Sequence, residues 1–142
     1  MPLDLNELEV SNDAPSVAEF LKLRKEGGLC LFTPEAARIG LKGTLFAVTL
    51  RHNGEAIGMG RIVGDGGCFL QIVDIAVDPR HRGKGLGKMV MAELMAIAKE
   101  NLPDTAFLSL LADVPANKLY AQFGFEETAP ESLGMFCRIK ND

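Results

Sequence analysis

The strongest chemical signal in this chain is a basic, glycine-rich turn over residues 80–88, RHRGKGLGK. An apolar run typical of a strand, Leu70 to Val77, precedes it, and a helical pattern from Leu86 to Asn101 follows it. The first amides of such a helix have no partners, and the helix dipole favours negative charge beside them. Glycines without Cβ atoms let a phosphate lie directly against the backbone. The turn also carries four cations on a chain of net charge −4: Arg80, Arg82, Lys84 and Lys88. The sequence therefore predicts one site for a phosphorylated ligand at this turn.

Two common phosphate-binding loops do not fit the turn. A Walker loop needs Ser or Thr after its Gly-Lys pair, but Gly87-Lys88 is followed by Met89, so the hydroxyl that would hold magnesium is absent. A dinucleotide loop that began at Gly83 would need a third glycine at position 88, which is a lysine. That fingerprint also normally opens its domain, whereas this turn lies past the middle of the chain. Both loops are excluded.

A third pattern, R-x-x-G-x-G, is filled by Arg82, Gly85 and Gly87. It resembles the acyl-CoA loop of the GCN5-related N-acetyltransferase (GNAT) family, a loop that cradles the pyrophosphate of CoA. Residues 74–79, DIAVDP, look like the family's strand before the loop, and residues 117–125, NKLYAQFGF, look like its downstream segment.

The resemblance implies acetyl-CoA as the cosubstrate. In the family, the strand before the loop and the strand after the long helix splay apart, and the pantetheine arm bonds to backbone there like an added strand. The C-terminal segment 129–136 is also similar to the ending of plant plastid acetyltransferases that act on arylalkylamines and protein lysines. The positions that would bind acetyl-CoA are Ile75, Ala76, Val77, Arg82, Gly83, Lys84, Gly85, Leu86, Gly87, Lys88, Asn117 and Tyr120.

Two residues are the candidates for catalysis. Tyr120, the single tyrosine of the chain, matches the family position that donates a proton to the CoA sulfur. A phenol with a pKa of about 10 can protonate a thiolate whose thiol has a pKa of about 8.5; the alternative is packing beside Phe123 and Phe125. Asp74 matches a position that often holds a glutamate base. An aspartate of pKa about 3.9 is a poor direct base for an ammonium. Three other roles stay open for Asp74: an anchor for the amine, one end of a water chain, or a carboxylate satisfied by backbone amides or an arginine.

Two further sets of residues have alternative interpretations. The family often uses an asparagine at position 117 to contact CoA, and the alternative is a helix-surface or capping amide. An apolar acceptor pocket could be lined by Met59, Phe69, Met135 and Phe136, although such residues are more often ordinary core.

Composition argues against several other classes of protein. No apolar run approaches the ~20 residues that span a bilayer, and the acidic N-terminus lacks the features of a signal peptide. The acidic balance, 19 Asp and Glu against 15 Lys and Arg, argues against nucleic acid as a partner. The three widely spaced cysteines and two histidines suggest reduced thiols and no metal site. We therefore expect a cytoplasmic protein without metal, nucleic-acid or membrane partners; a homodimer is common in similar proteins.

The pattern of apolar residues and turn signals predicts an α+β (mixed α/β) domain spanning residues 1–142. Helices are expected at 15–26, starting near Asp13 or Ala14, and at 34–39 after a Thr33 cap, 86–101 and 115–122. Strands are expected at 3–10, 45–51, 56–63, 68–77, 105–111, 125–128 and 135–139, with a hairpin turn at Asn53-Gly54. The resemblance implies the GNAT fold: a twisted, mostly antiparallel mixed sheet of six to seven strands, with a splayed pair, flanked by about four helices.

The function expected from these residues is transfer of acetyl from acetyl-CoA to a primary amine, by direct attack in a ternary complex. The alternative is a non-catalytic acyl-CoA-binding module that keeps the pyrophosphate loop without chemistry. Tyr120 and Asp74 together favour the enzyme.

Overall fold

The computed structural model describes residues 3–140, so the expected domain of residues 1–142 extends two residues beyond the described range at each end. The chain divides into two compact units, Met1–Leu110 and Leu111–Asp142, and each is described by itself.

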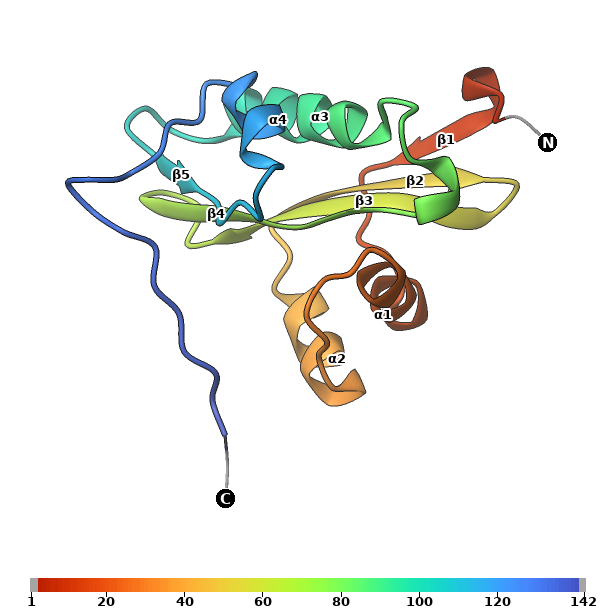
Figure 1. Cartoon of the computed structure of the whole chain (residues 1–142), viewed down its shortest axis with the longest axis horizontal. Helices are drawn as coiled ribbons and strands as arrows, with labels where there is room; N and C mark the ends of the chain where they lie inside the picture. The colour runs from red at the N-terminus through yellow and green to blue at the C-terminus, as the bar shows by residue number, and fades with distance from the viewer. Residues whose placement is uncertain (1–2, 141–142) are drawn as a thin grey trace. The chain divides into compact units, whose positions relative to one another are not determined.

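The first unit is built on a five-stranded sheet with the strands in sequence order (Figure 1). The strands are β1 (Leu8–Ser11), β2 (Phe46–His52), β3 (Glu55–Gly64), β4 (Phe69–Val77) and β5 (Phe107–Ser109). The first four pair antiparallel, and β4 pairs parallel to β5. The hairpin predicted at Asn53-Gly54 is confirmed, with the positive φ values of 51° and 80° that this turn requires.

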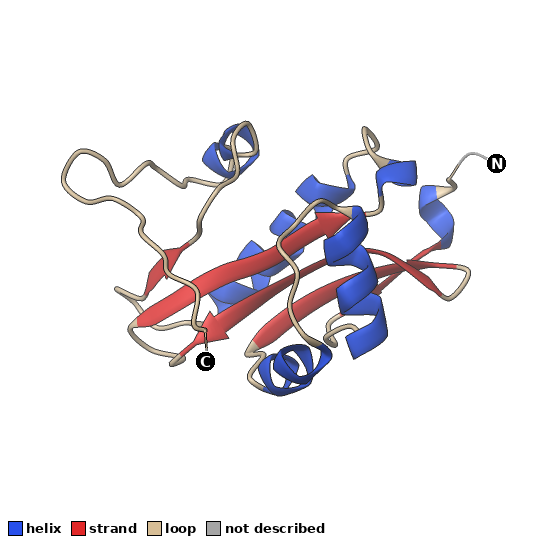
Figure 2. Cartoon of the chain, turned by 60° about the horizontal axis from the view of Figure 1, so that its bottom comes forward, coloured by secondary structure: helices blue, strands red, loops and turns tan. Residues whose placement is uncertain are grey.

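Helices cover both faces of this sheet. The long helix α3 (Leu86–Asn101) lies on one face, while α1 (Val17–Glu26) and α2 (Pro34–Lys42) lie on the other, which Figure 2 brings forward. Two short 3-10 turns, Leu5–Glu7 and Pro79–His81, complete the unit. The bounds of α3 are those predicted from its periodicity, and the Thr33 cap of α2 is confirmed by its bond from the Ala36 amide.

The start of α1 differs from the prediction. The helix begins after Ser16, not near Asp13 or Ala14, because Ser16 forms a capping box. Its hydroxyl accepts from the Glu19 amide at 3.1 Å, and the Glu19 carboxylate accepts from the Ser16 amide at 2.9 Å. These reciprocal bonds satisfy two amides that would otherwise lack partners.

Glu19 also ties α1 to the sheet, because Arg51 of β2 donates to its carboxylate at 2.8 and 3.1 Å. The Arg51 guanidinium lowers the pKa of Glu19 from 4.5 to about 2. A depressed carboxylate pKa contributes stability that is present above the unfolded value and is lost as the pH falls through the folded value. We expect Glu19→Gln to lower the free energy of unfolding by about 1 kcal/mol at pH 6. That gap should shrink by about half or more at pH 3 in urea denaturation curves.

The matched control is Glu35→Gln in the exposed first turn of α2, which should keep the wild-type pH dependence. A gap for Glu19→Gln that stayed constant from pH 6 to pH 3 would contradict the pairing with Arg51.

The contact between α3 and the sheet is set by Gly60 in β3. Buried apolar residues of α3 face the strands: Leu86, Val90, Met91 and Leu94 are each at most 1% exposed. A Cβ built on Gly60 would lie 2.6 to 2.9 Å from the side-chain tips of Ile75, Val90 and Leu94. The helix therefore packs this closely only because position 60 has no side chain.

We expect Gly60→Ala to destabilise the protein by about 1–3 kcal/mol, since the side chains of Ile75, Val90 and Leu94 must move to admit one methyl group. Gly40→Ala, inside α2 where a Cβ would meet nothing within 4 Å, is the control and should stabilise by up to about 1 kcal/mol. Urea denaturation measures both. Equal effects at the two positions would contradict the close approach of α3.

The second unit contains one short helix, α4 (Asn117–Ala121), and no strand within its described residues. The strands predicted at 125–128 and 135–139 are therefore wrong, and the sheet has five strands, not six to seven. The predicted strand at 105–111 is reduced to β5, and that at 3–10 forms only from Leu8. Alternating apolar residues make a segment compatible with a strand, but a strand exists only where a neighbour pairs with it. Met135 and Phe136 are instead more than 80% exposed.

Candidate functional site

The basic turn is held at its start by Asp78, which is 2% exposed at the end of β4. The Asp78 amide donates to the Ile57 carbonyl at 2.8 Å, and its carboxylate accepts from the Arg80 amide at 2.9 Å. The Arg80 guanidinium also donates to this carboxylate, at 2.7 Å from Nη2, and lowers the pKa of Asp78. Asp78 therefore fixes the direction in which the chain leaves the sheet.

Two glycines shape the turn between Arg82 and α3. Gly83 and Gly85 both have φ of +78°, a left-handed conformation that side chains disfavour. Gly85 stands at the N-cap of α3, where no side chain caps the helix. A Cβ on either glycine would meet no atom of the protein within 4 Å. The first-turn amides of a 16-residue helix are thus open to an anion.

The cations of the turn fall into two groups, one paired with carboxylates and one unpaired among residues 3–140. Arg80 is paired with Asp78 and with Glu55, and these carboxylates raise its pKa. Arg80 therefore stabilises the turn, and the carboxylates of Asp78 and Glu55 balance its charge. The exposed cations Arg82, Lys84 and Lys88 form no ion pair within residues 3–140. These three remain available to an anionic ligand.

One edge of β4 is open beside this turn. β5 pairs with β4 only from Phe69 to Gln71. From Ile72 to Val77, β4 has β3 on one side, and no described strand pairs with its other side. The candidate positions Ile75, Ala76 and Val77 all lie on this open stretch. Their backbone can therefore receive an extended ligand as an added strand.

A bulge interrupts β4 at Asp74. The register places Met59 opposite Ala76 and Arg61 opposite Val73, so Gly60 faces two residues of β4. Asp74 takes a positive φ of 62° here, and its side chain is 3% exposed. Its Oδ1 accepts from Arg24 Nη1 at 2.5 Å and its Oδ2 from Arg61 Nε at 2.6 Å. This is the arginine-paired arrangement that the sequence analysis left open.

The second unit brings Asn117 and Tyr120 together on α4, three residues apart and so on one face of the helix. Tyr120 is half-buried, and burial, followed by the charge of Asp113, raises the pKa of its phenol. The Asn117 Oδ1 atom is buried and accepts no hydrogen bond from residues 3–140. A phenol of raised pKa is protonated at neutral pH and so can donate.

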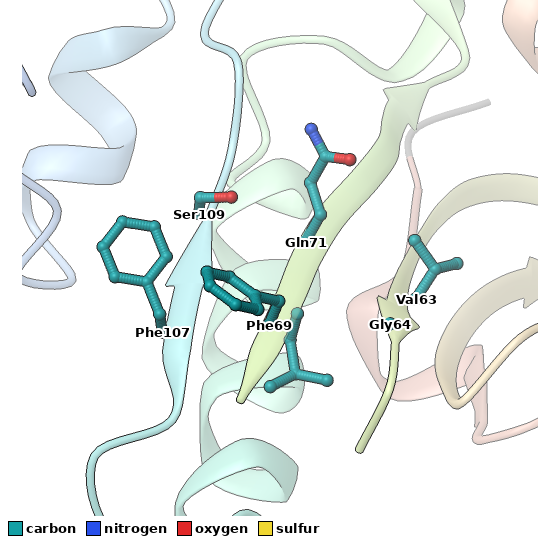
Figure 3. A pocket seen from close by; sticks show the side chains of 7 residues that line it. Val63, Gly64, Phe69, Gln71, Phe107 and Ser109 are labelled. Atoms are coloured by element: carbon teal, nitrogen blue, oxygen red, sulfur yellow. The ribbon is translucent and has the colours of Figure 1, made fainter. Parts of the chain in front are cut away.

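A shallow pocket of about 360 Å³ opens at the beginning of β4 and β5 (Figure 3). The Phe69 and Phe107 rings meet edge to face with centroids 6.1 Å apart, and both are more than half exposed. Gln71 and Ser109 add an amide and a hydroxyl. The lining residues are Val63, Gly64, Phe69, Leu70, Gln71, Phe107 and Ser109. Phe69 was expected at an apolar pocket, whereas Met59 is fully buried in the core.

Sequence reasoning missed three residues of this region: Arg24, Arg61 and Asp78. A lone aspartate in an apolar strand signals a cationic partner, but Arg24 lies 50 positions and Arg61 13 positions away. Asp78 lies within residues 74–79, which resemble the family's strand before the loop, but no role was predicted for it. Its signal was its place immediately before Pro79, which begins the 3-10 turn.

No helix within residues 3–140 is long and apolar enough to cross a membrane. The same residues contain no group of three His, Cys, Asp or Glu side chains that could hold a metal ion.

The uncapped α3, the glycine turn and the half-paired β4 together form a candidate site for an anionic ligand with an extended arm. Residues 17–125 match the acetyltransferase (GNAT) family, and the chain belongs to that family. A probable acetyltransferase of unknown function from meticillin-resistant Staphylococcus aureus has the same fold, with a TM-score of 0.89. It is 42% identical, over 93% of this chain and 99% of that one.

Two plant proteins are also similar. GCN5-related N-acetyltransferase 2, chloroplastic, from Arabidopsis thaliana is 35% identical over 58% of this chain and 31% of its own length. Histone acetyltransferase TAP1 from Glycine max is 34% identical over 66% of this chain and 42% of its own length. The chain therefore spans less than half the length of these two relatives.

Proposed function

We propose that the protein transfers the acetyl group of acetyl-CoA to a primary amine, by direct attack within a ternary complex. The observation that carries this proposal is the junction of β4 and α3. There the glycine turn joins a strand edge, with which no described strand pairs, to an uncapped helix N-terminus that has three exposed cations on or beside it.

The donor's two parts match two features of this junction. The pyrophosphate would accept hydrogen bonds from the first-turn amides at Leu86 to Lys88, with Arg82 and Lys84 supplying positive charge. Leu86 is 1% exposed, so its backbone and not its side chain would take part. The pantetheine arm carries amides that can bond to the open edge from Ile75 to Val77.

The chemistry requires a neutral amine, an acceptor for charge on the thioester oxygen and a proton for the departing sulfur. The amine nitrogen forms a bond to the carbonyl carbon and loses a proton to water, the C–S bond breaks, and the thiolate takes a proton. We assign that proton to the Tyr120 phenol, whose raised pKa keeps it protonated at neutral pH. Asn117, one turn away with an unbonded buried oxygen, would contact the CoA.

We place the acceptor beside the Phe69–Phe107 pocket. This pocket lies on the same face of the sheet as the side chain of Arg61, which bonds to the candidate catalytic residue Asp74. Val63, which lines the pocket, follows Arg61 by two positions in β3, so both point to one face. The names of the relatives, one an N-acetyltransferase and one a histone acetyltransferase, support an amine as acceptor.

One observation favours a second function, a non-catalytic acyl-CoA-binding module. Asp74, the candidate base, has both carboxylate oxygens bonded to arginines inside the core. A site that binds the thioester without a base could store or sense it.

Release of free thiol from acetyl-CoA separates these functions. The purified chain is incubated with a panel of small amines and lysine-containing peptides, and acetyl-CoA binding is measured by calorimetry. The enzyme predicts thiol release that depends on one class of amine. Tight binding without amine-dependent release would support the module, and no binding at millimolar acetyl-CoA would refute both.

We also propose a cytoplasmic location and a homodimer. The widely spaced cysteines support a reducing compartment. Cell fractionation and sedimentation of the purified chain test these two proposals.

A further inference from the structure

We propose that Arg24 and Arg61 act with Asp74 as a positioning cluster. The cluster holds the bulge of β4 in the shape that receives the thioester, and Asp74 does not take the acceptor's proton. This inference rests on the proposed acetyl transfer, because it assigns roles within that reaction.

The cluster sits where the sheet opens. Gln71 is the last residue of β4 that pairs with β5, and the bulge begins three residues later at Asp74. A bulge leaves one extra residue outside the ladder and re-aims the backbone around it. The conformation of Asp74 thus decides which way the amides at the beginning of the open edge point. A thioester carbonyl that gains negative charge during attack needs such an amide at a defined place.

Arg24 is held in place by the segment that follows α1. Its Nε and Nη2 donate to the Cys30 carbonyl at 3.0 and 2.8 Å. Its guanidinium carbon also lies 4.7 Å from the centre of the Phe32 ring. The bond from Arg24 to Asp74 therefore links the bulge to α1 and to the segment that follows it.

Arg61 makes the matching link to α2. Its Nη1 donates to the Gly40 carbonyl at 3.1 Å and to the Thr44 hydroxyl at 2.8 Å, while its Nε holds Asp74. A planar guanidinium supplies these bonds from fixed positions, which a lysine could not reproduce. The bulge is thus connected to α1, α2 and β3 through one carboxylate.

The charge of the cluster argues against two roles of Asp74, an anchor for the amine and a base that takes its proton. Two guanidiniums and one carboxylate sum to +1, and the three side chains are at most 9% exposed. A net positive cluster repels an ammonium and so makes a poor anchor for a cationic amine. To accept a proton, Asp74 would have to release an arginine into the core and leave a buried charge unpaired.

Four variants test the proposal: Asp74→Asn, Arg61→Gln, the double variant and Arg61→Lys. Asparagine keeps the shape of the side chain and tolerates a left-handed backbone, so Asp74→Asn changes mainly the charge, from +1 to +2. The double variant, Asp74→Asn with Arg61→Gln, returns the net charge of the cluster to +1. Acetyl-CoA Kd, kcat and the pH profile of kcat are measured at a temperature where every variant is folded, with Glu19→Gln as a destabilised variant outside the cluster.

We expect Asp74→Asn and Arg61→Gln each to raise the acetyl-CoA Kd at least fivefold and to lower kcat. Because Arg61 is not a proton acceptor, its effect identifies positioning. The double variant should recover at least half of the Asp74→Asn loss on a logarithmic scale, and Arg61→Lys should fall between wild type and Arg61→Gln. The acid limb of the pH profile should persist in Asp74→Asn, and Glu19→Gln should keep the wild-type Kd.

The opposite pattern would overturn the proposal. If Asp74 is a base, Asp74→Asn should have a kcat at least a hundredfold lower, an unchanged Kd and no acid limb in its pH profile. The double variant should then show no recovery of kcat, and Arg61→Gln should keep the wild-type Kd and kcat. If Asp74→Asn does not fold, wild-type Kd and kcat in both Arg61 variants would overturn it equally. Failure of the proposed function would instead be seen in the wild-type protein, which would bind acetyl-CoA without releasing thiol.

Discussion

Gly85→Val should raise the acetyl-CoA Kd at least tenfold. Gly85 is the N-cap of α3 and has φ of +78°, a conformation that costs a side chain about 1–2 kcal/mol. The backbone can relieve this strain only by rotating the first-turn amides away from the pyrophosphate. A β-branched side chain also occupies space beside the turn. Calorimetric titration with acetyl-CoA measures the loss.

The chain contains a matched control for this variant. Gly54, in the hairpin turn between β2 and β3, has φ of +80°, and a Cβ there also meets nothing within 4 Å. Gly54→Val should therefore cost similar stability but leave the Kd within about twofold of wild type. Wild-type affinity in Gly85→Val, or an equal loss in both variants, would show that the turn is not the pyrophosphate site.

Tyr120→Phe should lower kcat at least tenfold and leave the acetyl-CoA Kd unchanged. The substitution removes one hydroxyl and keeps the ring, so packing and ground-state binding persist while the proton donor is lost. Burial, with Asp113, raises the pKa of this phenol, so the donor stays protonated as the pH rises past about 10. An alkaline loss of kcat should therefore begin only above the usual phenol range in the wild type, and should be absent from Tyr120→Phe.

The two interpretations of Tyr120 differ in one respect. If Tyr120 only packs beside its neighbours, Tyr120→Phe keeps both the stability and the kcat of the wild type. Equal kcat at neutral pH would therefore remove the catalytic assignment, whatever happens to the alkaline limb. Urea denaturation of the variant checks that any loss of turnover is not a loss of folded protein.

The connection of strand, glycine turn and helix was predictable because its parts are contiguous. Seven of the expected residues, Arg82 to Lys88, follow one another, and local backbone preferences place them between a strand and a helix. The bounds of α3 and the Asn53-Gly54 hairpin were also correct, since periodicity and turn chemistry are local properties. The capping box at Ser16 was equally visible in the sequence, as a serine three residues before Glu19, and was overlooked.

The environment of Asp74 was not predictable in the same way. Its partners come from α1 and β3, 50 and 13 positions away, and nothing in the strand itself indicates which arginines approach it. Arg80 shows the same limit, because it was counted among the four cations of the turn, whereas its charge is paired with Asp78 and Glu55. Long-range pairing depends on which elements pack together.

Sequence alone determined where the glycine turn leaves the first amides of α3 without a side-chain cap, since this arrangement depends on neighbouring residues only. It also determined the order of the elements up to β5, through short-range patterns of apolar residues. Tertiary structure alone decided which apolar segments became strands, because a strand needs a neighbour, and 125–128 and 135–139 have none among the described residues. Tertiary structure also decided that Asp74 is enclosed by two guanidiniums, since the electrostatics of a buried carboxylate depend on distant residues that only folding brings within bonding distance.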